Sequence, residues 1–299
     1  MKKLFLFLSI IATCNACVQA ETGKSGALLW EISGNGLDKP SYLLGTLHLK
    51  SGDYLDKIPG AKASLQSCEQ VVGEVNMSDM ATMQMQMQQA MMMNSDTTYR
   101  ILYSDEDYRF VSEEMTSLIG VGLDQMKIMK PAAIQLTITL FMCAKYFPDI
   151  TPANALDAYI QTEAKKEQKP VVGLETAADQ IYVLLGSMSL QRQADLLLCT
   201  IKNMDKMNAL MLELIDNYDR GDLDKLYQSQ DKNNELCSST PAETNALNKD
   251  RNMAWMEKLP GIMKEKPSFI AVGALHLAGE EGLLNLLEKA GYTVKPVKQ

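Results

Sequence analysis

Both histidines of this 299-residue chain follow a glycine by three positions at the end of an apolar run. Residues 42–49 read Tyr-Leu-Leu-Gly-Thr-Leu-His-Leu and residues 269–277 read Phe-Ile-Ala-Val-Gly-Ala-Leu-His-Leu. Imidazole transfers protons near neutral pH and is the commonest protein ligand of metals, and the glycine lets a backbone or ligand approach closely. The pattern predicts that His48 and His276 lie at strand ends in a functional site, and two satisfied core histidines are the alternative.

Two glutamates repeat this arrangement of apolar strand, glycine and polar side chain. Glu74 lies in Gln-Val-Val-Gly-Glu-Val at residues 70–75, and Glu175 follows Pro-Val-Val-Gly-Leu at residues 170–174. A carboxylate is costly to bury unless it is paired or bound to a metal. The alternatives are an exposed edge position for Glu74 and a first-turn acid that complements a helix dipole for Glu175.

Parallel neighbouring strands would bring these four side chains to one edge of a sheet. Imidazole and carboxylate together suit Mn²⁺, Fe²⁺, Co²⁺ or Zn²⁺. We therefore expect a divalent transition metal held by His48, Glu74, Glu175 and His276. Glu74 or Glu175 could instead serve as general base, and Glu74 is the candidate catalytic residue.

Arg251, followed by Asn252 in a late helical segment, is the second candidate catalytic residue beside Glu74. A guanidinium group can hold a carboxylate or a developing oxyanion. A surface or interdomain salt bridge is the alternative. The sequence has neither the Gly-x-Ser-x-Gly nor the His-Glu-x-x-His motif of the best-known serine and zinc hydrolases.

The paired segments 45–48 and 273–276, Gly-Thr-Leu-His and Gly-Ala-Leu-His, resemble the TraB/PrgY/GumN family. That family is related to Tiki metalloproteases and more remotely to the erythromycin-esterase/ChaN group. Further matching segments lie at residues 73–74, 173–176, 221–224, 251–252, 278–284 and 290–294. The resemblance implies a metal-dependent hydrolase of peptide or protein substrates, although an ester substrate stays open. Relatives linked to pheromone shutdown or iron uptake imply the alternative, a non-catalytic periplasmic protein that binds a peptide, haem or metal.

Hydrophobic periodicity predicts an α/β fold with a central mixed sheet built from the N- and C-terminal strands and a large helical middle region. We expect strands at residues 27–33 and 40–47, joined as a hairpin, and at 70–75, 169–174, 267–272 and 292–297. The last two should run parallel through a right-handed crossover. Helices are expected at 61–67, 105–118, 131–146, 154–166, 189–218, 243–257 and 279–289. One domain, residues 21–299, would contain a helical insertion at about 78–258.

Residues 77–93 hold eight methionines interleaved with glutamines. Thioethers are soft ligands that suit Cu(I), so a copper-buffering protein is a third functional class. We favour a flexible helix that packs methionines against a mobile partner or a substrate groove. Because few of its residues look committed to a core, this segment should be more sensitive to proteases than the strands.

Residues 1–20 are typical of a signal peptide. Lys2 and Lys3 precede a short apolar run, and Val-Gln-Ala at 18–20 is a small-residue cleavage site before Glu21. A lipoprotein modified at Cys14 or Cys17 is the alternative. No later segment is apolar and long enough to cross a membrane. These features predict a periplasmic or secreted protein.

The remaining cysteines and the charge agree with that compartment. An even number of cysteines after the leader suggests two disulfides with three possible connectivities among Cys68, Cys143, Cys199 and Cys237, and four buried thiols are the alternative. The net charge of −8 and the lack of a basic stripe argue against a nucleic-acid partner.

Overall fold

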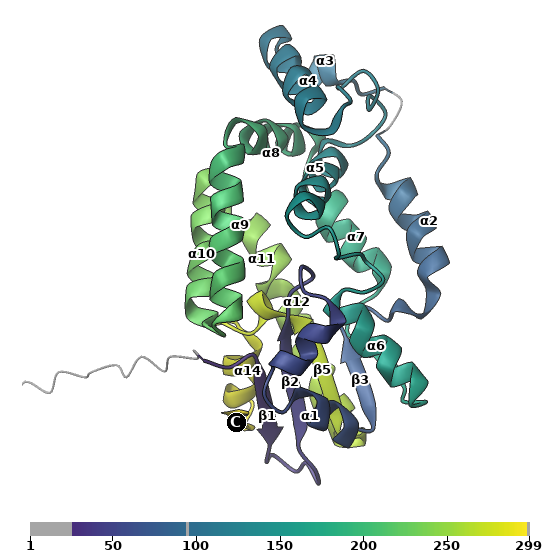
Figure 1. Ribbon diagram of the computed structural model, residues 1–299, viewed down its shortest axis with the longest axis vertical. Coiled ribbons are helices and arrows are strands. Elements are labelled where there is room, and N and C mark those ends of the chain that lie inside the picture. The colour runs from purple at the N-terminus through teal and green to yellow at the C-terminus, as the bar shows by residue number, and fades with distance from the viewer. Residues whose placement is uncertain (1–25, 94–95, 298–299) are drawn as a thin grey trace, which may run out of the picture.

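A six-stranded mixed sheet forms the base of the molecule in the computed structural model, which describes residues 26–93 and 96–297 (Figure 1). The strand order is β4-β3-β5-β2-β1-β6. The strands are β1 (Leu29–Ser33), β2 (Ser41–Thr46), β3 (Gln70–Gly73), β4 (Val171–Gly173), β5 (Ser268–Gly273) and β6 (Thr293–Pro296). Strands β2, β5, β3 and β4 are parallel neighbours, whereas β1 is antiparallel to both β2 and β6.

Helices make up most of the rest of the described chain. They are α1 (Ala61–Ser67), α2 (Met80–Ala90), α3 (Tyr99–Leu102), α4 (Asp105–Ile119), α5 (Pro131–Tyr146), α6 (Leu156–Lys166), α7 (Ala177–Leu185), α8 (Leu190–Lys202), α9 (Met204–Asp219), α10 (Leu223–Leu236), α11 (Pro241–Leu247), α12 (Lys249–Met256), α13 (Leu259–Glu265) and α14 (Leu283–Lys289). Short 3-10 turns lie at Gly52–Lys57, Met77–Asp79 and Ala274–His276.

The central strands β3 and β5 are buried along nearly their whole length. Every residue of β3 is buried, as are the first five of β5. Continuous burial of this kind means that helices cover both faces of the sheet, as is usual for parallel strands. Helices α1 and α6 lie in front of the sheet in Figure 1, and α14 packs behind it against β6. The predicted α/β fold with a helical middle region is confirmed.

The N-terminal hairpin of β1 and β2 is also as predicted. Because β1 is antiparallel to both β2 and β6, and β2 is parallel to β5, the last two strands run in the same direction as expected. They are not neighbours, since β2 and β1 lie between them. The N- and C-terminal segments of the chain therefore interleave in one sheet.

Two long helices predicted from periodicity are each broken in two by an asparagine. Asn203 separates α8 from α9, and Asn248 separates α11 from α12. Asn203 turns its side-chain amide back to the Cys199 carbonyl oxygen at 3.0 Å, and such local bonds compete with the helical backbone pattern. The helix expected from residue 279 begins instead at Leu283, because Gly279 has a φ of +86°.

The helical middle has a hydrophobic core of its own, separate from that of the sheet. It is built from α3, α4, α5 and α8, and its fully buried members include Val111, Met115, Ile134 and Leu197. Figure 1 shows α5, α8 and α9 framing the region above the strand ends. The helical core thus lies beyond the carboxyl ends of the parallel strands and is distinct from the sheet core.

The prediction of two disulfides is wrong. Cys199 and Cys237 are joined and link α8 to the end of α10, whereas Cys68 and Cys143 are free thiols. Cys68 follows α1 in the sheet core, while Cys143 lies on α5 beside Met211, with 3.9 Å between their sulfur atoms. The two free thiols belong to different parts of the molecule, so no bond forms between them.

The methionine-rich segment forms a 3-10 turn and α2. Met87 and Met91 pack against a small core of Ala133, Ile181 and Leu185, whereas Met85 is 54% exposed. Its expected protease sensitivity stays a prediction. The predicted leader, residues 1–20, lies outside the described residues. In the described part of the chain, no helix has both the length and the apolar character that a membrane crossing needs.

Candidate functional site

Four parallel strands end at the same edge of the sheet, and each is followed by a predicted site residue. The register pairs Thr46 with Gly273, and Gly73 with both Gly173 and Ala271, so β2 and β5 end level while β3 and β4 end two residues earlier at the same edge. Glu74 directly follows β3, and Glu175 lies two residues after the end of β4. Their backbones are joined by a 2.9 Å hydrogen bond from the Glu175 amide to the Glu74 carbonyl. Parallel pairing therefore places the polar side chains together, as ligand sites in open α/β sheets are placed.

Arg251, from α12, lies at the centre of this edge. Its Nη2 donates to Glu74 Oε2 and to Glu175 Oε1, both at 2.6 Å, and its Nε donates to Glu175 Oε2 at 3.0 Å. Its Nη1 bonds the Leu247 carbonyl at 3.1 Å and His276 Nε2 at 3.0 Å. These contacts use all five N–H groups of a guanidinium. Arg251 therefore positions the other side chains and has no N–H left for a substrate in this arrangement.

Glu74 accepts hydrogen bonds from three separate segments. The backbone N–H of Gly273 reaches Oε1 at 2.8 Å, while Gln180 on α7 and Arg251 reach Oε2 at 3.0 and 2.6 Å. Burial alone would raise the pKa of this carboxyl, but the Arg251 guanidinium and the hydrogen bond from the Gly273 N–H lower it below its ordinary value. Glu74 is therefore an ionised carboxylate fixed in direction at neutral pH.

Glu175 is enclosed by donors on both of its oxygens. Besides Arg251, Trp255 donates from Nε1 to Oε2 at 3.3 Å and Gln180 donates to Oε1 at 3.3 Å. The side chain is only 8% exposed. Buried carboxylates need such complete pairing, and here the pairing ties Glu175 to α7 and α12.

His276 is a buried, neutral imidazole whose tautomer follows from its partners. The Asn252 amide nitrogen donates to the carbonyls of His276 and Glu281 at 3.1 and 2.8 Å, which turns its Oδ1 toward His276 Nδ1 at 2.8 Å. Nδ1 must therefore carry the proton, and Nε2 accepts from Arg251. Burial lowers the pKa of His276 to about 4, and the ring packs 4.4 Å from that of Trp255.

His48 differs from His276 in exposure and in charge. Its side chain is 69% exposed, and its Nδ1 lies 2.8 Å from Asp157 Oδ2 on α6. Thr46 donates to the other oxygen of the same carboxylate. The hydrogen bond and negative charge of Asp157 raise the pKa of His48 to about 9. At neutral pH His48 is therefore a cation whose Nε2–H is left for other partners.

A small pocket joins the two halves of the site. It is lined by His48, Asp157, Glu74, Gln180 and Met83, among others, and has a volume of about 50 Å³. A space of this size has room for water. His48 and Glu74 thus border one water-sized pocket from opposite ends of the site, with opposite charges.

The two motif glycines are needed because other groups approach their Cα atoms closely. A Cβ on Gly45 would lie 3.0 Å from the Ala274 side chain and 3.1 Å from Leu277, both in the second motif. A Cβ on Gly273 would lie 3.3 Å from Glu74 Oε1. The first glycine lets the two motifs pack together, and the second lets Glu74 reach the strand backbone.

The predicted four-ligand metal set does not face a shared open centre. Arg251 lies between Glu74, Glu175 and His276, and it uses the Nε2 lone pair of His276 and both oxygens of Glu175. Within the described residues, no three His, Cys, Asp or Glu side chains form a metal-binding group. A metal held by His48, Glu74, Glu175 and His276 together does not fit this arrangement unless Arg251 moves away.

Several residues of the site were not found from the sequence. Asp157 and Gln161, four residues apart, lie on the buried face of α6 with Leu156, Ile160 and Ala164. The sequence could have indicated these two residues, because they are polar side chains on the otherwise apolar face of that helix. Asn252 stands directly after Arg251, but its role depends on the loop it binds. Gln180 and Trp255 gave no local signal.

The fold and the site together define an α/β protein with a polar cluster at the carboxyl ends of its parallel strands. A family model described as TraB/PrgY/gumN matches residues 28–296, nearly the whole chain. The chain therefore belongs to the TraB/PrgY/gumN family. Neither a curated protein nor a solved structure matches the chain significantly.

Proposed function

We propose that this protein is an exported hydrolase that cleaves peptide or protein substrates at the strand-end site. The observation that carries the proposal is the placement of ionised Glu74 and cationic His48 around one water-sized pocket. A fixed carboxylate and an Asp-supported imidazole are the parts that general acid–base catalysis requires. The family resemblance supplies the substrate class.

The proposed roles follow from the charge of each group. Glu74 accepts a proton from the attacking water, whose hydroxyl adds to the peptide carbonyl carbon. His48, protonated and held by Asp157, donates its Nε2 proton to the leaving nitrogen as the C–N bond breaks. Arg251 and Glu175 position Glu74, and neutral His276 is held by Asn252 and Arg251.

A divalent transition metal, Mn²⁺, Fe²⁺, Co²⁺ or Zn²⁺, stays a prediction of the family resemblance. The roles above do not use it, because the donor atoms of Glu175 and His276 are taken by Arg251. Export is part of the proposal as well, and the Cys199–Cys237 disulfide is compatible with an oxidising compartment.

The test is hydrolysis of dye-quenched casein by the purified protein and its variants. We expect Glu74→Gln and His48→Ala to lower the rate by about 10²- to 10⁴-fold, the usual contribution of a general acid or base. Glu69→Gln is the control, because Glu69 precedes β3 and is 51% exposed in a pair with Lys39. Full activity in folded Glu74→Gln protein would exclude this mechanism.

A non-catalytic binding protein for a peptide, haem or metal is the second candidate. This function is favoured because all five N–H groups of Arg251 donate to other groups of the protein, which leaves none to stabilise a reacting substrate. A ligand that binds wild type and Glu74→Gln equally, with no product formed by either, would support this function instead.

A further inference from the structure

Two adjoining chambers lie beside the strand-end motifs, lined mainly by helices of the middle region. The apolar chamber, of about 430 Å³, is lined by α5, α9 and α10, and the polar chamber, of about 330 Å³, by α10, α11 and α12. Gln230, Asn234 and Leu275 line both, so the chambers adjoin one another. Their volumes fall in the range of about 300–1,000 Å³ that is typical of ligand sites.

The chambers reach the site through its own motifs. Leu275, which lines both, directly precedes His276, and Leu49 of the apolar chamber directly follows His48. Asn252, which accepts a hydrogen bond from His276, also lines the polar chamber. A molecule that fills the chambers therefore contacts residues that directly adjoin His48 and His276 in the chain.

The apolar chamber is rich in methionine. Met142, Met204, Met207 and Met211 line it together with Ile138 and Leu214. Methionine side chains are flexible and polarizable, and they adapt to apolar groups of different shape. The chamber therefore fits an apolar side chain and does not select a single shape.

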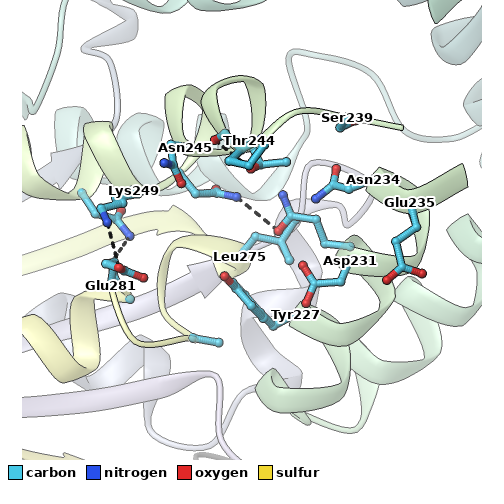
Figure 2. A pocket seen from close by; sticks show the side chains of 16 residues that line it. Tyr227, Asp231, Asn234, Glu235, Ser239, Thr244, Asn245, Lys249, Leu275 and Glu281 are labelled. Atoms are coloured by element: carbon cyan, nitrogen blue, oxygen red, sulfur yellow. Dashed lines mark hydrogen bonds and ion pairs between the residues drawn. The ribbon is translucent and has the colours of Figure 1, made fainter. Parts of the chain in front are cut away.

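The polar chamber combines amides with an excess of negative charge, as Figure 2 shows. Asn234 and Asn245 offer both a donor and an acceptor, which is what a peptide backbone requires. The lining holds three carboxylates, Asp231, Glu235 and Glu281, against one ammonium, Lys249. Lys249 is paired with Glu281 at 2.9 Å, so the charges left over are negative and favour a basic ligand.

We propose that the two chambers bind the substrate as an extended peptide, with an apolar side chain in the apolar chamber and a neighbouring basic residue at the polar chamber. The inference rests on the proposed action on peptides, because it names the sequence that this site selects. Substrates with acidic residues beside the apolar residue are disfavoured by Asp231 and Glu235.

The test measures equilibrium binding by fluorescence anisotropy, with labelled peptides Gly-Ser-Lys-Phe-Lys-Ser-Gly and two analogues. One analogue replaces Phe by Ser, and the other replaces both Lys by Glu. We expect the parent peptide to bind at least about tenfold more tightly than either analogue, as one apolar group or charge pair commonly provides.

A pair of neighbouring α9 variants assigns the difference to the chamber. Met211→Gln should abolish the preference for Phe over Ser, whereas Leu212→Gln should keep it, because Leu212 is 44% exposed and does not line the chamber. Met207→Gln replaces Met211→Gln if that variant fails to show wild-type circular dichroism. Asp231→Asn with Glu235→Gln should abolish the preference for Lys over Glu.

Equal affinities for the three peptides, or equal effects of the Met211 and Leu212 substitutions, would overturn the inference. All binding measurements use the Glu74→Gln background, which lacks the proposed general base, so the outcome is separate from that of the hydrolysis test. Selective binding without cleavage would keep the inference and remove the hydrolase. Cleavage of casein without peptide selectivity would do the reverse.

Discussion

Nη1 of Arg251 lies 3.0 Å from Nε2 of His276, and the imidazole is the acceptor in this contact. A guanidinium offers no acceptor in return, and the Nδ1–H of His276 donates to Oδ1 of Asn252. The second histidine of the paired motif is therefore locked as a neutral side chain, whereas the first is a cation beside Asp157. Two copies of the Gly-x-Leu-His motif thus contain histidines in different protonation states.

Removal of Arg251 should be strongly destabilising. Arg251→Ala leaves Glu74 and Glu175, which are 13% and 8% exposed, without their cation. Loss of one partner of a buried ion pair commonly costs about 3–5 kcal/mol, measurable as the free energy of unfolding in urea. Arg220→Ala is the control, since Arg220 is 60% exposed in a surface pair with Asp216, and it should cost under about 0.5 kcal/mol. Equal costs for both variants would contradict the arrangement.

The two histidines should titrate at opposite ends of the pH range. With its folded pKa at about 4, below the ordinary 6.5, His276 stabilises the fold above pH 6.5 and loses this contribution as pH falls through 4. With its folded pKa at about 9, His48 stabilises the fold below pH 6.5 and loses this contribution as pH rises through 9. Stability from these two groups is therefore greatest near pH 6.5.

Nuclear magnetic resonance can check both values, because the chain has two histidines and hence two imidazole signals. In chelator-treated protein, one signal should titrate near pH 9 and the other near pH 4. His48→Gln should remove the signal of higher pKa. Two signals that both titrate near 6.5 would show that Asp157 and burial do not act as described.

Metal binding should compete with Arg251. A Co²⁺ ion held by His276 and Glu175 has to displace the guanidinium from both. We expect Arg251→Met protein to bind Co²⁺ at least about tenfold more tightly than wild type. Substitution of residues that hydrogen-bond to metal ligands commonly changes metal affinity by about 10–100-fold. Absorption titration of the visible Co²⁺ bands measures this. Equal affinity in wild type and variant would place any bound metal away from Arg251.

The cysteines should react in two classes. Iodoacetamide applied to denatured, unreduced protein is expected to modify Cys68 and Cys143 but not Cys199 or Cys237. Reduction should lower the free energy of unfolding by about 2–4 kcal/mol, the usual contribution of a cross-link, here between cysteines 38 positions apart. Mass spectrometry with four modified or four protected cysteines would contradict the pairing.

Export should remove the first 20 residues of the chain. Mass spectrometry of protein from the periplasm or medium is expected to show Glu21 as the first residue, because Val-Gln-Ala precedes it as a cleavage site. A retained Met1 would contradict the leader. A lipid-modified Cys14 or Cys17 would identify a lipoprotein instead.

The sequence by itself determined the strands and the edge at which they end. Apolar runs closed by Gly and a polar residue mark buried parallel strands, because burial on both faces leaves a continuous apolar pattern. In the structure, Glu74, Glu175 and His276 lie around Arg251 at that edge. The sequence also distinguished the helical middle from the strands of the sheet. It did not predict that two of the helices are broken at Asn203 and Asn248.

Only the tertiary structure decided how those side chains are paired. The partner of His48 is Asp157, 109 positions away, and that of Glu74 is Arg251, 177 positions away. Such pairs depend on how α6 and α12 are placed against the sheet, and hydrophobic periodicity carries no information on that placement. The pairing of Cys199 with Cys237 could not be predicted from the sequence for the same reason, because a disulfide requires a specific distance and orientation between the two cysteines. Periodicity therefore determined which residues reach the edge, and helix packing determined which lone pairs and protons remain available there.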